Sequence, residues 1–360
     1  MPGTYVIALD THCPFTEVGV LTPGGRLTRR GRCPTTIRDL RRKVLQVRGR
    51  RNIVVEEGPV ADWIARGLVP VADRVTVCDP RRNHLIAKDS DKDDPIDVEK
   101  LARLYRGGYV KAVHHPETFD RVVFKRHVGL YHDVVRERVR RANRVMGELR
   151  QYGVFVKEKG FAEVAKADAR RGLLERLPFH PLVRADLQRL WRMYDAGATY
   201  VRQMRRSLVA QAEQEPQIVR FTALPGMKWV RASTFFAYVD TPWRFPSKQA
   251  LWKYLGIGLE RRRSGGGPER VRVPLGVNRG LKSVILGAAE SAIRSRENPF
   301  AEQYERWLHA GLSPRIARRN VARSQATVMW GMWKSGSVYR PEWVGAAAVE
   351  QGEVLSQKLR

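Results

Sequence analysis

The first 106 residues alternate short apolar runs with amphipathic segments, and the order of these segments constrains the fold most strongly. Three β-type runs, YVIALD, EVGVLT and RLTRRGR, lie between Tyr5 and about Arg32. The turn sequence Pro23-Gly24-Gly25 joins the last two runs, as is typical of a hairpin. This part of the sequence therefore predicts a three-stranded meander.

Helices and strands alternate after the meander. The segment TTIRDLRRKVLQV predicts a helix with Thr35 or Thr36 as its N-cap, and the strand NIVVE follows it. A second helix around residues 60–68, the strand RVTVC and a helix over residues 94–106 complete the series. A meander followed by helix, strand, helix, strand and helix is the element order of an RNase H-like α/β fold.

Four acidic residues lie at the ends of these elements. Asp10 ends YVIALD, Glu56 ends NIVVE, and Asp94 and Asp97 belong to the last helix. The first and fourth strands of such a sheet are neighbours, so Asp10 and Glu56 are expected side by side, and an i, i+3 spacing places Asp94 and Asp97 on one helix face. Carboxylate oxygens suit Mg²⁺, and two such ions about 4 Å apart can serve both the attacking and the leaving oxygen of a phosphodiester. The four carboxylates therefore predict a phosphate-cutting metal site.

Two of these four positions have competitors in the sequence. Glu57 competes with Glu56, because a shift of one residue moves a strand side chain to the other face of the sheet. Asp91 competes with Asp94 in the crowded segment before the helix. An Asp at a strand end is also an ordinary turn or cap residue, and for Asp10 taken alone this interpretation is as good as a metal ligand.

Composition narrows the partners and the compartment. The 360 residues carry a formal net charge of +29, with 66 Lys plus Arg against 37 Asp plus Glu. Such an excess attracts polyanions, of which nucleic acid is the commonest. Cys13, Cys33 and Cys78 are odd in number, widely separated and without a CxxC pair, which predicts neither a zinc site nor a disulfide framework and favours a reducing cytoplasm. The start lacks the features of a signal peptide, and no apolar run approaches the roughly 20 residues of a membrane helix, so we expect no membrane association.

The rest of the chain divides into a middle and a C-terminal part. Residues 113–216 have helical periodicity and predict a long hairpin or coiled coil that spaces or pairs other parts. Its Arg-rich stretch RERVRRANR is either a phosphate-tracking face or a solvated helix face. Residues 217–343 begin with a Leu-Pro-Gly-Met turn like that of a helix-hairpin-helix element, whose backbone amides and helix N-terminus would meet a phosphate.

These pieces together resemble the DEDD-type insertion-sequence transposases. Members of that family have a RuvC-like N-terminal domain and include recombinases guided by a bridge RNA. The matching segments occur in order as IALD, EEGP, CDPRRN and a D-x-x-D helix that continues into LARL. The LARL register selects Asp94 and Asp97 over Asp91. Val98 stands where the family usually has alanine.

The resemblance continues into the C-terminal part through LGIG, SGGG and LGVNRGLKSVILGAA, which again occur in order. By this resemblance Ser264 is the nucleophile, although a serine beside glycines is ordinarily a loop residue. A serine hydroxyl needs activation near neutral pH, by metal ions or by a neighbouring base. Ser233 and Ser247 lie nearby in sequence, in helix-like and cap-like contexts. The segment PERVR after the glycines departs from the family, which leaves the geometry of the loop open.

Basic residues near these motifs are assigned to nucleic-acid contacts. The three arginines before Ser264 either stabilise developing phosphorane charge or hold DNA. The assigned residues are Arg81, Arg82, Arg261, Arg262, Arg263, Arg279 and Lys282.

The expected organisation is a RuvC-like, RNase H-fold catalytic domain over residues 1–112, a helical coiled-coil linker or oligomerisation region over 113–216, a mostly α C-terminal transposase domain over 217–343 and a tail over 344–360. The resemblance implies a DNA transposase or site-specific recombinase that uses Mg²⁺, with two ions expected and Mn²⁺ as an alternative. It further implies donor and target DNA, a guide RNA, a homodimer or homotetramer, and a prokaryotic cytoplasm with association to the nucleoid. Two rivals remain, a junction-type metal-dependent endonuclease that uses water and a non-catalytic nucleic-acid-binding protein.

Overall fold

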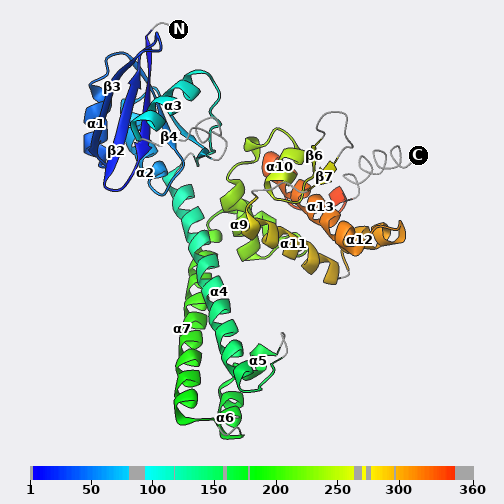
Figure 1. Ribbon diagram of the computed structural model, residues 1–360. Coiled ribbons are helices and arrows are strands. Elements are labelled where there is room, and N and C mark those ends of the chain that lie inside the picture. The colour runs from blue at the N-terminus through cyan, green and yellow to red at the C-terminus, as the bar shows by residue number, and fades with distance from the viewer. Residues whose placement is uncertain are drawn as a thin grey trace. The chain divides into compact units, whose positions relative to one another are not determined.

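The computed structural model describes residues 3–80, 94–116, 118–156, 160–176, 179–262, 270–272, 277–295 and 297–344. The chain forms two compact units, Met1–Glu117 and Thr118–Arg360, which are described separately (Figure 1). The predicted division at residue 216 falls within the second unit and stays a prediction.

Unit 1 contains a five-stranded mixed sheet in the order β3-β2-β1-β4-β5. Its strands are β1 (Thr4–Thr11), β2 (Phe15–Leu21), β3 (Leu27–Pro34), β4 (Arg50–Glu56) and β5 (Arg74–Cys78). The first three strands pair antiparallel, whereas β4 runs parallel to both β1 and β5. The predicted meander and the predicted pairing of the first and fourth strands are therefore present.

Helices cover both faces of this sheet. The helices are α1 (Ile37–Leu45), α2 (Ala61–Leu68), which continues into the 3-10 turn η1 (Val69–Val71), and α3 (Asp94–Arg106). Thr36 caps α1 by accepting a hydrogen bond from the Asp39 amide, as its sequence predicts. Apolar residues of α1 and α2 pack against Ile7 and Leu9, and those of α3 pack against Val6 and Ala8. Consecutive residues of β1 thus alternate between the two faces.

Unit 2 begins with two long helices, α4 (Phe119–Gln151) and α7 (Pro181–Ala212), separated by the short helices α5 (Phe161–Val164) and α6 (Ala167–Arg176). Val128 of α4 packs with Leu208 of α7, and Leu149 packs with Leu187, so the two helices run antiparallel. The predicted helical hairpin is therefore present.

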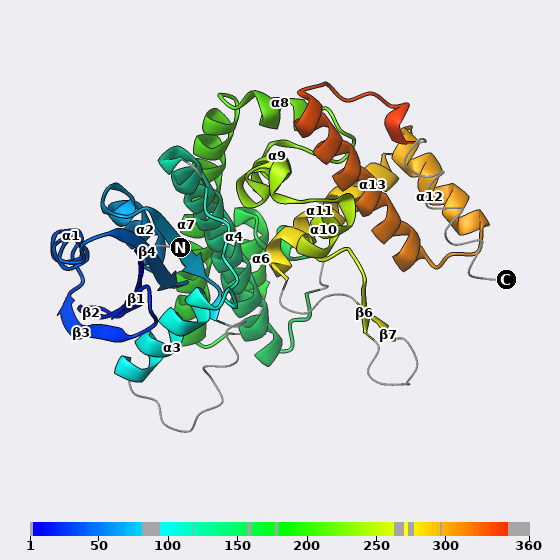
Figure 2. The same cartoon turned by 90° about the horizontal axis from the view of Figure 1, so that it is seen from above.

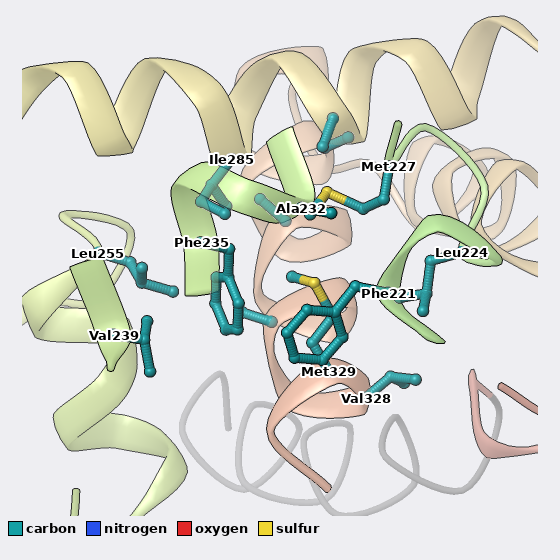
Figure 3. Close-up of a cluster of buried hydrophobic side chains, with 14 of the residues drawn as sticks. Phe221, Leu224, Met227, Ala232, Phe235, Val239, Leu255, Ile285, Val328 and Met329 are labelled. Atoms are coloured by element: carbon teal, nitrogen blue, oxygen red, sulfur yellow. The ribbon is translucent and has the colours of Figure 1, made fainter. Parts of the chain in front are cut away.

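The remaining helices of unit 2 enclose one large core. They are α8 (Pro216–Thr222), α9 (Trp229–Val239), α10 (Lys248–Tyr254), α11 (Arg279–Arg294), α12 (Pro299–His309) and α13 (Pro314–Ser335), with a 3-10 turn η3 at Pro242–Arg244. Phe221 of α8, Phe235 of α9 and Met329 of α13 meet in this core (Figure 3). Unit 2 is thus largely helical, whereas unit 1 is mixed α/β, as expected. Within the described ranges, no helix is long and apolar enough to span a bilayer.

A two-stranded hairpin is the part of unit 2 that the sequence did not predict. Strands β6 (Glu260–Arg262) and β7 (Arg270–Arg272) pair antiparallel on either side of the segment that carries the glycines (Figure 2). Arg261 and Arg262 therefore belong to a strand, where a loop was expected.

The Leu-Pro-Gly-Met turn lies against α11. Gly226 has φ +79°, and a Cβ at this position would lie 2.1 Å from the Ala288 carbonyl oxygen of α11. Leu224 and Met227 on either side are buried, and the Arg231 guanidinium donates a hydrogen bond to the Gly226 carbonyl. Close packing against α11 thus explains the glycine. The expected phosphate contact at this turn stays a prediction.

Candidate functional site

Asp10 and Glu56 lie at equivalent positions of two adjacent parallel strands. Ala8 pairs with Val54 and Leu9 with Val55, so one more step along both strands places Asp10 beside Glu56. Both carboxylates are partly buried, and the Asp10 side chain is 22% exposed. The carboxyl ends of β1 and β4 therefore form one edge of the sheet with two neighbouring acids.

Strand alternation decides which glutamate shares a face with Asp10. Ala8 and Val54 belong to the apolar cluster beneath α3, and side chains two residues further along each strand lie on that same face. Glu56 also pairs with Cys78, another member of this cluster. Glu57 follows outside the strand and is exposed. The geometry favours Glu56 as the partner of Asp10.

Helix α3 begins near the same edge of the sheet. A Cβ on Gly19 would lie 2.4 Å from Val98 Cγ1, and a Cβ on Gly25, in the turn after β2, would lie 1.8 Å from an Arg106 nitrogen. The helix therefore follows β2 from Gly19 towards Gly25, antiparallel to β1. Asp10 pairs with Glu17, two residues before Gly19.

The distances along the helix and the strand agree with this placement. Four residues of helix from position 98 back to its start at position 94 span about 6 Å. Two residues of strand from Gly19 to Glu17 span about 6.6 Å. The first turn of α3 thus reaches the level of Asp10. The backbone of Asp94 belongs to this turn, but its side chain lies outside the described atoms, while Asp97 is partly buried.

These residues have the chemistry that a hard divalent cation requires. Carboxylate oxygens come from Asp10 and Glu56 on the sheet face beneath α3, and from Asp97 on α3 itself. The backbone of Asp94 belongs to the first turn of α3. Across the described part of the chain, no group of three or more His, Cys, Asp or Glu is close enough to hold a metal ion. The Asp94 side chain lies outside the described atoms, so the complete tetrad stays a prediction.

Two further groups at this edge were not predicted from the sequence. His12 Nε2 lies 3.1 Å from Asp10 Oδ2. The buried Glu17 carboxylate, opposite Asp10, accepts a hydrogen bond of 2.6 Å from Arg32 Nε, and the Arg32 guanidinium stacks 3.7 Å above the Phe15 ring. The Arg32 guanidinium thus compensates the charge of Glu17. Asp10 and His12 are two residues apart, a spacing that places both side chains on one face of an extended strand and could have indicated their contact. The register that brings Glu17 to Asp10 depends on the turn between β1 and β2, which the sequence pattern does not determine.

Some of the predicted residues fall in the gaps between the described ranges. Ser264, Arg263, Arg81, Arg82 and the competing Asp91 lie outside the described residues. Of the serines near Ser264 in sequence, Ser247 caps α10 by accepting from the Ala250 amide, and Ser233 is buried within α9. The cap-like context of Ser247 is therefore confirmed, whereas Ser233 lies inside its helix and caps nothing.

Arg279 and Lys282 lie in the first turn of α11, which Asn278 caps by accepting a hydrogen bond from the Leu281 amide. They line a shallow depression of about 400 Å³ together with Ser283, Glu290 and Arg318. Arg318 and Arg294 hold the pKa of Glu290 below its ordinary value. The two predicted basic residues thus share one surface beside the base of the β6–β7 hairpin.

The chain therefore combines an acidic sheet edge in one unit with a basic helical surface in the other, a combination suited to a protein that processes nucleic acid. Residues 219–305 match the family model described as transposase IS116/IS110/IS902 family. The match supports a transposase function, and with it a DNA-recombining activity and DNA as a partner. No curated protein matches the chain.

Proposed function

We propose that this chain is an insertion-sequence transposase or recombinase whose first unit is an RNase H-like, RuvC-like catalytic domain. The observation that carries the proposal is the common face of Asp10 and Glu56, which the first turn of α3 approaches. On this proposal Asp10, Glu56, Asp94 and Asp97 hold Mg²⁺. The family match over residues 219–305 supports the transposase part independently of the sheet.

Bound at this edge, two divalent ions would stabilise the negative charge on the attacking and the leaving oxygen of a phosphodiester. Ser264 is the proposed nucleophile. Its Oγ forms a bond to phosphorus while the bond from phosphorus to the leaving oxygen breaks, and the hydroxyl proton passes to a base. The product is a phosphoserine link to one DNA strand, which the hydroxyl of a second strand then resolves.

The proposal includes a division of labour among nucleic acids. A structured guide RNA pairs with donor and target DNA, while the protein holds backbone and shape. The high net charge supports binding of this kind without distinguishing DNA from RNA. A homodimer or homotetramer is proposed through the α4–α7 hairpin, and light scattering of the purified protein would measure it.

A covalent-adduct assay tests the nucleophile. The full-length protein and its Ser264→Ala variant are incubated with Mg²⁺ and labelled donor DNA, with and without RNA recovered from cells that express the protein from its native flanking DNA. We expect a denaturation-resistant protein–DNA adduct with the unchanged protein, dependent on that RNA, and none with Ser264→Ala. The matched control is Ser247→Ala, which removes a helix cap and should keep the adduct.

The other outcomes select the rivals. Mg²⁺-dependent cleavage that persists in Ser264→Ala without any adduct would assign the site to an endonuclease that uses water. Binding without cleavage, unaffected by Asp10→Asn and Asp97→Asn except in affinity, would leave a non-catalytic nucleic-acid-binding protein. Adduct formation without RNA would remove the guide from the proposal.

A further inference from the structure

The start of α13 concentrates positive charge that the described structure does not neutralise. The helix contains four arginines and one lysine and no acidic residue. Arg315, Arg319 and Arg323 recur every four residues, so they form one ridge along the helix. Arg318 differs from these three because its guanidinium lies 3.2 Å from a Glu290 carboxylate oxygen. Among the described residues, no ion pair joins Arg315, Arg319 or Arg323 to an acid.

Three other exposed arginines of unit 2 are paired with acids on their own helices. On α4, Arg136 pairs with Asp133 and Arg140 pairs with Glu137 three residues away. On α7, Arg189 pairs with Asp186 in the same spacing. A solvated helix face with local ion pairs explains those residues, but it does not explain the ridge on α13.

This arrangement is unfavourable for the free protein. Burial lowers the pKa of Arg323 to about 10, with a further contribution from Arg319. Burial also lowers the pKa of Arg319, and the charges of Arg315 and Arg318 act in the same direction. Arg315 lies in the first turn of the helix, where the macrodipole disfavours positive charge. Among the described residues no acid pairs with Arg315 or Arg319, whereas an anionic ligand would stabilise both charges.

The ridge ends at the base of the β6–β7 hairpin. Arg323 Nε donates a hydrogen bond of 2.8 Å to the Ile257 carbonyl, three residues before β6, and Arg323 Nη1 donates to Asn320. These bonds use two of the five N–H donors of the guanidinium. On α11, Lys282 Cδ would lie 3.1 Å from a Cβ on Gly256, and Val277 also contacts this position. Lys282 and Arg323 thus contact the same turn, where the two ends of the hairpin segment meet.

We propose that the ridge of Arg315, Arg319 and Arg323, with Arg279 and Lys282 of α11, binds the phosphodiester backbone of a nucleic-acid strand at the base of this hairpin. The strand would reach the segment that carries Ser264 with its backbone already fixed. The site rests on the proposed function for its role in catalysis, but the binding itself needs neither metal nor Ser264. DNA and RNA share the phosphodiester chemistry, so the test separates them.

Equilibrium binding to the full-length protein in EDTA tests the site. The double variant Arg315→Gln/Arg319→Gln is compared with Arg136→Gln/Arg140→Gln, which removes the same charge from α4. The probes are fluorescent duplex DNA, single-stranded DNA and single-stranded RNA of one sequence, each titrated over a series of salt concentrations. We expect the α13 variant to bind about 100-fold more weakly or worse, because two charge-assisted hydrogen bonds to phosphate are lost. Its slope of log K against log salt should fall by about 1.8 with duplex DNA or about 1.4 with a single strand.

The control variant should keep the slope of the unchanged protein. The probe for which the salt slope falls in Arg315→Gln/Arg319→Gln identifies the kind of strand that the ridge binds. Equal losses in both double variants would show a net-charge effect and overturn the site, as would an unchanged slope with all three probes. A second readout is the unfolding midpoint, which should stay the same or rise in Arg315→Gln/Arg319→Gln because repulsion is relieved. A lowered midpoint alongside the lost affinity would assign these arginines to folding and overturn the proposal.

Binding in EDTA also separates this site from the proposed chemistry. The Ser264→Ala variant should form no covalent adduct but should bind the three probes with the affinities of the unchanged protein. Unchanged affinities in the α13 variant would overturn the ridge without affecting the assignment of the nucleophile.

Discussion

A single glycine sets how closely α3 approaches the sheet. Gly19 lies beneath the buried Val98, next to Asp97, and leaves no space for a methyl group. The sequence shows both residues, and it shows Val98 as a departure from the alanine usual in the similar family. It could not show that they meet, because this contact depends on how α3 docks on the sheet.

Gly19→Ala should therefore lower the stability of unit 1. A methyl group 2.4 Å from Val98 Cγ1 forces α3 outward, and overpacking of this kind costs about 1–3 kcal/mol. This outweighs the gain of about 0.5–1 kcal/mol from replacing a glycine within a strand. Thermal unfolding of the full-length protein measures the change, and Gly19→Ala/Val98→Ala should recover part of the loss.

The control for this prediction is Gly31→Ala in β3. A Cβ there would meet its nearest atom, Lys43 Nζ, at 3.8 Å, which is ordinary contact. Equal effects of Gly19→Ala and Gly31→Ala, or no recovery in the double variant, would contradict the close docking of α3.

At the scale of whole elements, the sequence predicts the helices and strands that neighbouring residues along the chain determine. The Thr36 cap and the apolar spacing predict α1, and the D-x-x-D and LARL pattern predicts α3 with the bounds that the structure has. The parallel pairing of β1 with β4 followed from the element order. The β6–β7 hairpin was not predicted, because its strands are three residues each and strongly charged, without an apolar alternation. The pair of Glu17 and Arg32 depends on a register between strands that local patterns do not determine.

The contact of α4 with α9 contains a group that titrates. His132 Nε2 lies 2.9 Å from Thr234 Oγ1, which itself donates to the Val230 carbonyl, so the neutral imidazole is the donor to Thr234. Burial, and secondarily the Arg136 charge, lower the pKa of His132 from its ordinary value of 6.5. The unfolded chain then binds this proton at a higher pH than the folded one. Stability from this group is complete above pH 6.5 and is lost as the pH falls through the lower folded value.

His132→Gln should reduce this pH dependence, because the amide of Gln keeps a donor towards Thr234 and does not titrate. Urea unfolding at about pH 7.5 and about pH 5.5 measures it, on either side of the ordinary histidine value. The unchanged protein should lose more stability between these two conditions than the variant. Equal losses would show that other groups account for the acid sensitivity.

At the scale of the molecule, the two units have different tasks in the proposed function. Unit 1 provides the acidic edge of a sheet, and unit 2 provides the basic surface and the segment with Ser264. The family match falls within unit 2 and gives independent support there. The sequence indicated both parts, because carboxylates at strand ends and an excess of 29 positive charges are visible without coordinates. It assigned Glu56 with Glu57 as a competitor, and the pairing of β4 with β1 and β5 favours Glu56.

The most direct test of the central claim is therefore Mg²⁺-dependent cleavage of DNA that carries the ends of the insertion sequence, measured with Glu56→Gln and Glu57→Gln side by side. Each variant removes one charge from adjacent positions, so net charge is matched, and thermal unfolding of both variants checks that they fold. The account predicts that Glu56→Gln lowers the cleavage rate by about 100-fold or more, as expected for loss of several kcal/mol of transition-state stabilisation. Glu57→Gln should cleave as the unchanged protein does. Cleavage that survives in Glu56→Gln, or that is lost in Glu57→Gln alone, would contradict the acidic edge as the catalytic centre.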